Sequence, residues 1–413
     1  MREFIILFIV SLIFINAQEK DNDLNELTVK KAIELAFMNN PILNQLIQEK
    51  EKKKAEYLGA FGLSTPNISY MKEGIKNSKF AEQRLTVSQS IDFPLKTSYT
   101  LNSISNEKEA FELKIESEKL SLAAEVKTNY TDIIYSSDLK NLYKEQIRLS
   151  LELVNAVKAK VEAGESSEGD LMKAEIKAAE AQNDFEEADR QFHISRYNLF
   201  KAIGLNPELQ KYSIKFPDSL EYVEINVGQL KVLENLKQLP GYLSAEKIVE
   251  AAENKISAAW SGLLPNLNFS YYKQDYGSGF SFSGFEIGLQ IPIWFALNNN
   301  SEIQQASAIR NQLLYKQKEI QLEMKTSIEH TWHSYETSLS TIKRYDSNIR
   351  MKSKELRDLT LEGYRLGELD LLSLLDSQRT YLQSQKRYLD ALRDYYYQLV
   401  NLEKYLNTTL VFN

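Results

Sequence analysis

Carboxylate side chains gather around two short glycine turns, and they are the residues of this 413-residue chain best placed to do chemistry. The first turn reads AGESSEGD at 163–170, and the second reads LGELDLLS at 366–373. Glycine favours a sharp reversal between helices because it tolerates a positive φ. Ser167 and Asp170 are suited to cap the helix that follows. The turns are therefore either helix caps alone or caps that also form a charged contact site.

Two histidines, His330 and His333, lie three residues apart beside Glu329 in the phrase EHTWHSY. Such a pair on one helix face can contribute to a metal site. The interpretation that we favour places both histidines on a solvated face while Trp332 packs inward. The chain has no cysteine and only three histidines, and it lacks a phosphate-binding glycine loop. We therefore expect neither an enzyme nor a bound cofactor or metal.

The N-terminus has the features of an export signal. Arg2 precedes an unbroken apolar run from Phe4 to Val10 and further apolar residues up to Ile15, which predicts a signal peptide over residues 1–17. A membrane anchor is the alternative, although the run is short for a bilayer span. The net charge of −7, without a basic block, argues against a nucleic-acid partner. With only 15 glycines and 8 prolines, the composition favours long regular elements.

Proline and glycine landmarks recur half a chain apart. Pro66 in STPNISYM and Pro265 in LLPNLNFSY are 199 residues apart. Three further pairs have nearly the same spacing: Pro41 with Pro240, Pro94 with Pro292, and Gly164 with Gly367. A period near 200 is too long for the unit of a solenoid. We interpret the chain as a tandem duplication that covers 18–220 and 221–413.

Each repeat is predicted to contain the same elements in the same order. A helix precedes the proline, and the apolar pattern then changes to a period of two, which is typical of a β-hairpin. A stretch without Gly or Pro predicts a helix roughly 100 Å long, and a glycine turn leads into a return helix. A change of apolar phase at Ser283-Gly284 predicts a β-bulge. The predicted ranges are hairpins at 66–93 and 265–292, long helices at 96–163 and 298–362, and return helices at 170–203 and 371–406.

The predicted strands, near ten residues each, are long enough to cross a bilayer at a tilt. Alternating apolar and polar residues suit a lipid-facing and a water-facing side, although a soluble sheet alternates in the same way. Four strands cannot close a barrel, and an open sheet edge cannot lie in lipid. Three chains would supply twelve strands. We therefore expect a homotrimeric, twelve-stranded transmembrane β-barrel continuous with a long periplasmic α-helical barrel, with Ile68, Tyr70, Leu267 and Phe269 facing lipid or an adjoining barrel surface.

The order of these elements and several phrases resemble the TolC-like outer-membrane efflux channel family over essentially the whole mature chain. The phrases are LTVKKAIELAFMNNP, LPNLNFSYY, IGLQIPIW and YRLGELDLLSLLDSQRTYLQSQKRYLDA. The resemblance implies a homotrimer in the outer membrane and periplasm. It also implies a periplasmic adaptor (membrane fusion) protein that links the trimer to an inner-membrane transporter of the RND type.

The cargo stays open at this point. The phrase IPIW with an Asn-rich start after it is similar to the heavy-metal efflux branch. Drug efflux and type I protein secretion would use the same architecture. An exported, purely structural coiled-coil protein is the alternative from another class.

The resemblance places the two glycine turns at periplasmic tips, where adaptors of the family dock and the tube closes. The docking residues of this chain would be Gly164, Ser167, Asp170, Leu171, Tyr364, Gly367, Leu369 and Asp370. Ser373 and Asp376 would form the aperture gate, where three copies of one carboxylate make a ring that favours cations. We also expect the Tyr364 hydroxyl to donate a hydrogen bond to Asp170 between neighbouring tips and to hold the closed state.

Overall fold

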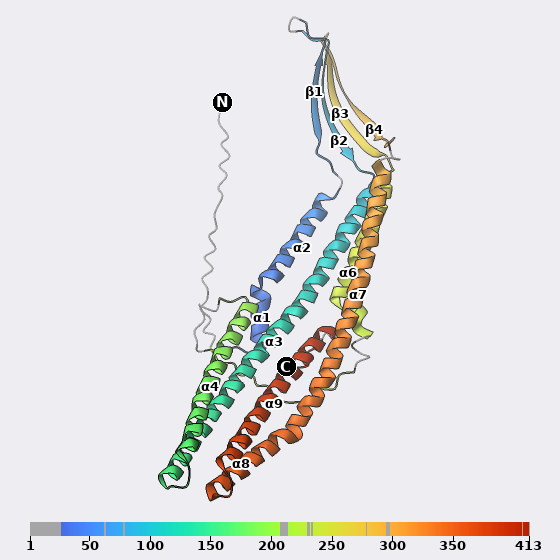
Figure 1. The fold of residues 1–413 in the computed structure, drawn as a ribbon. Helices are drawn as coiled ribbons and strands as arrows, with labels where there is room; N and C mark the ends of the chain where they lie inside the picture. The colour runs from blue at the N-terminus through green and yellow to red at the C-terminus, as the bar shows by residue number, and fades with distance from the viewer. Residues whose placement is uncertain are drawn as a thin grey trace, which may run out of the picture.

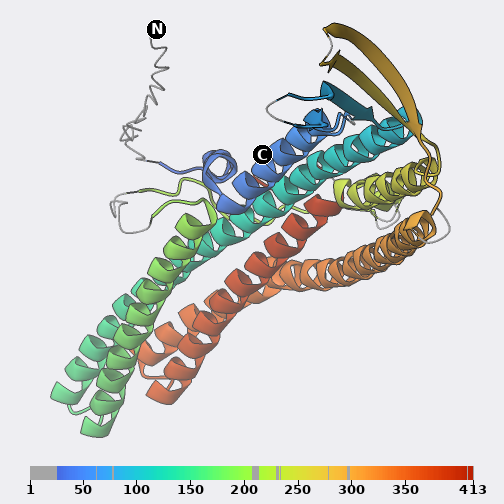
Figure 2. The same ribbon diagram turned by 90° about the horizontal axis from the view of Figure 1, so that it is seen from above.

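The computed structural model describes residues 26–412 apart from 62, 77–78, 207–213, 229–231, 233, 278, 295–297 and 407. The predicted signal peptide at 1–17 lies outside the described residues. The molecule is elongated, with a four-stranded sheet at one end and two helical hairpins at the other (Figure 1). The view from above shows the tips of the two helical hairpins ending side by side (Figure 2).

The described part of the first half contains four helices and one β-hairpin. Prolines start two of these helices because the first helical position needs no backbone N–H donor. Asn40 caps the second helix by accepting a 2.9 Å hydrogen bond from the Ile42 N–H. The elements are α1 (Val29–Asn39), α2 (Pro41–Gly59), β1 (Asn67–Glu73), β2 (Glu82–Ile91), α3 (Pro94–Glu162) and α4 (Glu168–Ala202).

The second half follows the same order with one interruption. Its elements are η2 (Asn235–Gln238), α6 (Pro240–Ser261), β3 (Asn266–Tyr276), β4 (Phe280–Gln290), α7 (Asn298–Arg344), η3 (Tyr345–Ile349), α8 (Arg350–Leu366) and α9 (Leu371–Leu406). The long helix predicted at 298–362 is interrupted at η3, which is a π-helical turn within it. Neither Gly nor Pro marks this turn. The column changes direction where α7 meets α8 (Figure 1).

The main hydrophobic core lies at the middle of the bundle, around α3, α4 and α9. The hydroxyl groups of three tyrosines hold the linker between the two halves against it: Tyr335, which donates to the Ile225 carbonyl, Tyr395 and Tyr396. The Tyr395 hydroxyl accepts from the Ile225 N–H at 3.1 Å and donates to the Val223 carbonyl at 3.0 Å. Tyr396 makes the same pair of bonds with Glu221. The linker is thereby tied to the second half by its backbone groups, and its side chains add an ion pair between Glu224 and Lys343 and a ring contact between Tyr222 and Tyr395.

The strands pair in the order β1-β2-β3-β4, and each pair is antiparallel. The register of β3 and β4 is unbroken from Asn266 opposite Gln290 to Tyr276 opposite Phe280. The bulge predicted at Ser283-Gly284 is therefore wrong. Gly284 has another role, since a Cβ there would come within 2.7 Å of the Tyr272 ring. The glycine leaves room for an aromatic neighbour rather than for an extra residue.

The two faces of the sheet differ in polarity. On the face that we call the apolar face, Ile68, Val87, Tyr271 and Phe285 lie opposite one another across the four strands. All four are exposed, and Phe285 keeps 80% of its surface. On the other face, the polar face, the row one residue away consists of Asn67, Ser88, Ser270 and Glu286. No helix within the described residues is long and apolar enough to span a membrane.

Candidate functional site at the helical tips

Both tips end in the same kind of turn. Gly164 and Gly367 adopt left-handed φ values of 77° and 80°. The Glu165 N–H donates to the Lys160 carbonyl, and the Glu368 N–H donates to the Gly363 carbonyl, each at 2.8 Å. This is the Schellman arrangement, in which a positive φ lets the last helical carbonyls find donors. Any residue with a Cβ would be strained at either glycine.

The return helices start with different caps. The Ser167 hydroxyl accepts from the Asp170 N–H at 3.1 Å and donates to the Asp170 carboxylate at 2.9 Å. Asp170 is therefore the third residue of α4 and not a cap, which corrects one part of the sequence prediction. In the second tip Asp370 is the cap, because its carboxylate accepts from the Ser373 N–H at 2.9 Å. The two tips thus satisfy their first N–H groups with different side chains.

The carboxylates at the tips are stabilised in their charged form. The Ser167 hydroxyl, followed by Lys173, lowers the pKa of Asp170 below its ordinary value. Hydrogen bonds from Ser373 lower the pKa of Asp370, while the negative charge of Asp170 opposes that shift. Both groups therefore carry negative charge at neutral pH.

A second, small hydrophobic core joins the two tips. Its buried residues come from both hairpins: Leu153, Val157, Ala174, Tyr364, Leu371 and Leu374, with Leu171 packed against them. Tyr364 is only 5% exposed. Because this cluster is separate from the main core, the tips hold together through their own contacts.

Lys160 makes the polar contact between the tips. Its ammonium group donates to the Tyr364 carbonyl at 2.8 Å and lies 4.5 Å from the centroid of the Tyr364 ring. The Tyr364 hydroxyl is buried and has no hydrogen-bond partner among the described residues. The predicted bond from Tyr364 to Asp170 is therefore absent between the two tips of one chain. Burial raises the pKa of Tyr364, and the charge of Asp170 adds to the rise.

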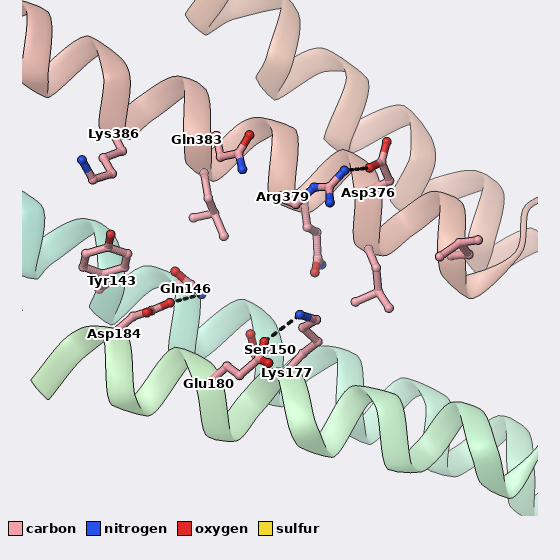
Figure 3. Close-up of a pocket in the computed structure, with 14 residues that line it drawn as sticks. Tyr143, Gln146, Ser150, Lys177, Glu180, Asp184, Asp376, Arg379, Gln383 and Lys386 are labelled. Carbon is pink, nitrogen blue, oxygen red and sulfur yellow. Dashed lines mark hydrogen bonds and ion pairs between the residues drawn. The ribbon is translucent and has the colours of Figure 1, made fainter. Parts of the chain in front are cut away.

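The predicted gate residues lie near a cleft beside the tips. Asp376 is exposed and accepts from Arg379 at 2.5 Å, so its charge is paired within the chain. Ser373 lies one turn earlier and is also exposed. Asp376 and Arg379 line a cleft of about 420 Å³ between α9 and the α3–α4 pair, where Lys177 and Glu180 form an ion pair on the other wall (Figure 3).

Sequence reasoning missed two residues of this site. In the sequence, Lys160 is one of several lysines in an alternating charge pattern that is typical of a solvated helix. Gly363 lies close to Gly367, and a Cβ on it would come within 2.7 Å of Leu369. The double glycine in EGYRLG was the available signal for a close approach of two backbone segments. For Lys160 the sequence holds no such signal, because its contact depends on the other tip.

The histidine pair has the surroundings of a solvated helix face. His330 and His333 are exposed, while Trp332 between them is buried. His333 lies 3.6 Å from Glu336, one turn further along α7. Within the described residues, no group of three or more His, Cys, Asp or Glu side chains is arranged to hold a metal ion.

Comparison with known families settles the class of the protein. The model of the outer membrane efflux protein family matches residues 66–205 and 234–408. The chain belongs to this family. As an outer membrane efflux protein it has its place in the outer membrane, with its helical part in the periplasm, and the resemblance drawn from the sequence is confirmed.

Relatives of this efflux protein are distant in sequence but close in fold. The pyoverdine export outer membrane protein OpmQ of Pseudomonas putida is 23% identical over 75% of this chain and 67% of its own length. The toxin and drug export protein A of Aggregatibacter actinomycetemcomitans is 24% identical over 72% and 67%. The outer membrane protein VceC of Vibrio cholerae has a TM-score of 0.77 at 13% identity, covering 92% of this chain and 95% of that one.

Proposed function

We propose that this efflux protein is a passive exit duct formed by three copies of the chain. The duct consists of a twelve-stranded barrel in the outer membrane and an α-helical barrel in the periplasm. It docks on a periplasmic adaptor protein that connects it to an inner-membrane transporter of the RND type. The observation that carries the proposal is the apolar face of a sheet whose two outer strands, among the described residues, each pair with one strand only.

The apolar face has the height of a membrane band. On β3 and β4 it extends from Tyr271 and Phe285 to Ile291, because the next row carries Lys273 and Ser283. On β1 and β2 it reaches one row further, to Tyr70 and Leu85. The band is longest between the row of Tyr70 and Leu85 and Ile291. This distance is about 27 Å along extended strands, or about 20 Å at a 40° tilt. Apolar bands of outer-membrane barrels are about 25 Å tall. One row beyond Tyr70, the same face turns polar with Lys72, as expected where lipid ends.

The sheet edges support assembly from several copies. In the described part of the chain, β1 pairs only with β2, and β4 pairs only with β3. Open edges cannot lie in lipid because their N–H and C=O groups would be unpaired. Pairing of β4 with β1 of the next copy would remove every edge.

The two outer helices of the chain each have an exposed apolar side. Within one chain α2 packs on α3, and α7 packs on α6. Both outer helices expose apolar side chains: Ile42 and Leu58 on α2, and Ile309, Tyr315 and Leu322 on α7. Contact between α7 of one copy and α2 of the next would bury them. Helix and strand edges therefore point to the same mode of assembly.

The tips are the proposed docking and gating region. We keep the predicted docking residues around Gly164 and Gly367, and we add Lys160 as the residue that holds the tips together. Asp376 remains the proposed aperture residue, with the difference that Arg379 neutralises it in the chain. The proposed aperture therefore carries less net negative charge than the sequence prediction implied.

The duct is proposed to be shared by different cargoes, with selection made mainly by the inner-membrane transporter. Two distant relatives carry names for pyoverdine export and for toxin and drug export. These names favour small-molecule export over heavy-metal cations, which stay the alternative together with type I protein secretion.

Cysteine cross-linking tests the assembly, because the natural chain has no cysteine. Ser69→Cys on β1 is combined in turn with Glu286→Cys and Gly288→Cys on β4, all on the polar face. We expect one combination to give covalent trimers in outer-membrane fractions, and each single variant to give none. A soluble monomer without cross-links would instead support the exported coiled-coil protein.

A further inference from the structure

The unbroken register of β3 and β4 creates an aromatic cluster at the end of the sheet far from the helices. The cluster consists of Tyr272, Tyr276, Phe280 and Phe282. The Tyr276 ring is stacked on Phe282 at 6.0 Å between centroids, and Phe280 lies 5.6 Å from Phe282. Tyr272 meets Phe282 edge-on at 6.3 Å. These separations are those of favourable aromatic pairs.

The cluster lies on the polar face, which faces the inside of the proposed duct. At the same height the apolar face carries Lys273, Asp275, Ser281 and Ser283, since these residues alternate with the aromatic ones. The cluster is therefore not a belt of lipid-facing aromatic residues. At this end of the sheet the polarity is inverted, because polar side chains lie on the apolar face and aromatic rings lie on the polar face.

The cluster is built rather than accidental. Tyr272 occupies the space above Gly284, and the guanidinium of Arg84 lies 4.6 Å from the centroid of its ring. Arg84 in turn donates to the Gln274 side-chain oxygen at 2.6 Å. Gln274 is only 2% exposed. The buried amide of Gln274 thus holds the Arg84 side chain in place, and the Arg84 guanidinium covers one face of the Tyr272 ring.

The remaining rings stay accessible, because Phe280 is 64% exposed and Tyr276 is 39% exposed. Exposed ring faces in a water-filled duct stack favourably with flat aromatic solutes, because both partners bury apolar surface and their rings attract one another. We propose that the aromatic cluster is a stacking site for planar aromatic solutes inside the outer mouth of the duct. This inference rests on the proposed function, since the duct supplies the inside of the barrel.

The test uses caffeine, a soluble, planar and uncharged probe, and inositol as a non-planar, uncharged control. Saturation-transfer NMR on the full-length protein in deuterated detergent measures the binding of both. We expect caffeine binding, no inositol binding, and a roughly tenfold weaker caffeine affinity for the Phe280→Leu/Phe282→Leu variant. The matched control is Phe285→Leu on the apolar face of the same strand, which should bind caffeine like the natural chain.

Two outcomes would overturn the stacking site: equal caffeine affinity in the natural chain and the double variant, or an equal loss in Phe285→Leu. Thermal unfolding of each variant shows whether it is folded, and Phe282→Leu alone serves if the double variant is not. Conductance of the natural protein in planar bilayers is measured in parallel. A conducting trimer that binds caffeine no better than inositol would contradict the stacking site alone. A protein that forms neither a trimer nor a conducting channel would contradict the proposed duct as well.

Discussion

The ammonium group of Lys160 lies 2.8 Å from the Tyr364 carbonyl oxygen and 4.5 Å from the centroid of the Tyr364 ring. One side chain of the first tip therefore binds the second tip in two ways. A hydrogen bond from a charged donor contributes about 1.5–3 kcal/mol, and a partly exposed cation–π contact contributes about 0.5–1 kcal/mol. We therefore propose that this residue holds the two tips together.

Replacement of Lys160 by Met is expected to raise the leak conductance in planar bilayers roughly tenfold. The change keeps the aliphatic stem but removes the charge, so the tips separate more often. Lys158→Met is the control, because Lys158 is exposed on the same helix. Equal conductance of the two variants would show that Lys160 does not hold the tips.

Replacement of Tyr364 by Phe is expected to leave the leak conductance and the melting temperature unchanged or slightly improved. The hydroxyl is buried without a hydrogen-bond partner in the described chain, and removal of an unpaired polar group costs nothing. A clear rise in conductance would instead support the predicted hydrogen bond from Tyr364 to Asp170, formed between neighbouring copies.

The tips are expected to lose stability in acid. The pKa of Asp170 is lower in the folded chain than its ordinary value, so its contribution is full above about pH 4 and disappears as the pH falls through the folded pKa. The melting-temperature difference between the natural chain and Asp170→Asn should therefore shrink to zero in acid. Ser167→Ala should reduce the same difference at neutral pH. A difference that is constant with pH would contradict this account.

Replacement of Tyr395 by Phe is expected to destabilise the protein by about 1–3 kcal/mol, because the Ile225 N–H and the Val223 carbonyl would lose their partner. Denaturant unfolding measures the change, and proteolysis should cut the linker faster. Tyr315→Phe is the control on an exposed tyrosine. A variant as stable as the natural chain would mean that water replaces the hydroxyl.

Replacement of Ile287 by Arg is expected to reduce the amount of protein in outer-membrane fractions, because a charge on the lipid face costs about 2–4 kcal/mol at the bilayer centre. Glu286→Arg, one residue away on the polar face, should insert normally. Opposite behaviour of the two variants would reverse the assignment of the faces.

The sequence by itself determined the family, the two hairpins and the long helices. Glycine permits the left-handed turn at Gly164, and Pro66, which a helix interior could not accommodate, lies directly before β1. The periods of apolar residues do the same for the elements between them. These features need no information about distant parts of the chain.

The tertiary structure alone decided which side chains meet. The π-turn at Tyr345–Ile349, the contact of Lys160 with Tyr364, the pairing of Asp376 with Arg379 and the ring of Tyr272 above Gly284 were not predicted. The contact of Lys160 with Tyr364 joins segments that are far apart in sequence. Tyr272 and Gly284 meet across one hairpin, and Asp376 and Arg379 are three residues apart on one helix. In each case the final side-chain positions follow from packing and charge pairing in the folded chain. A local pattern names the residues that can act, but only the fold selects their partners.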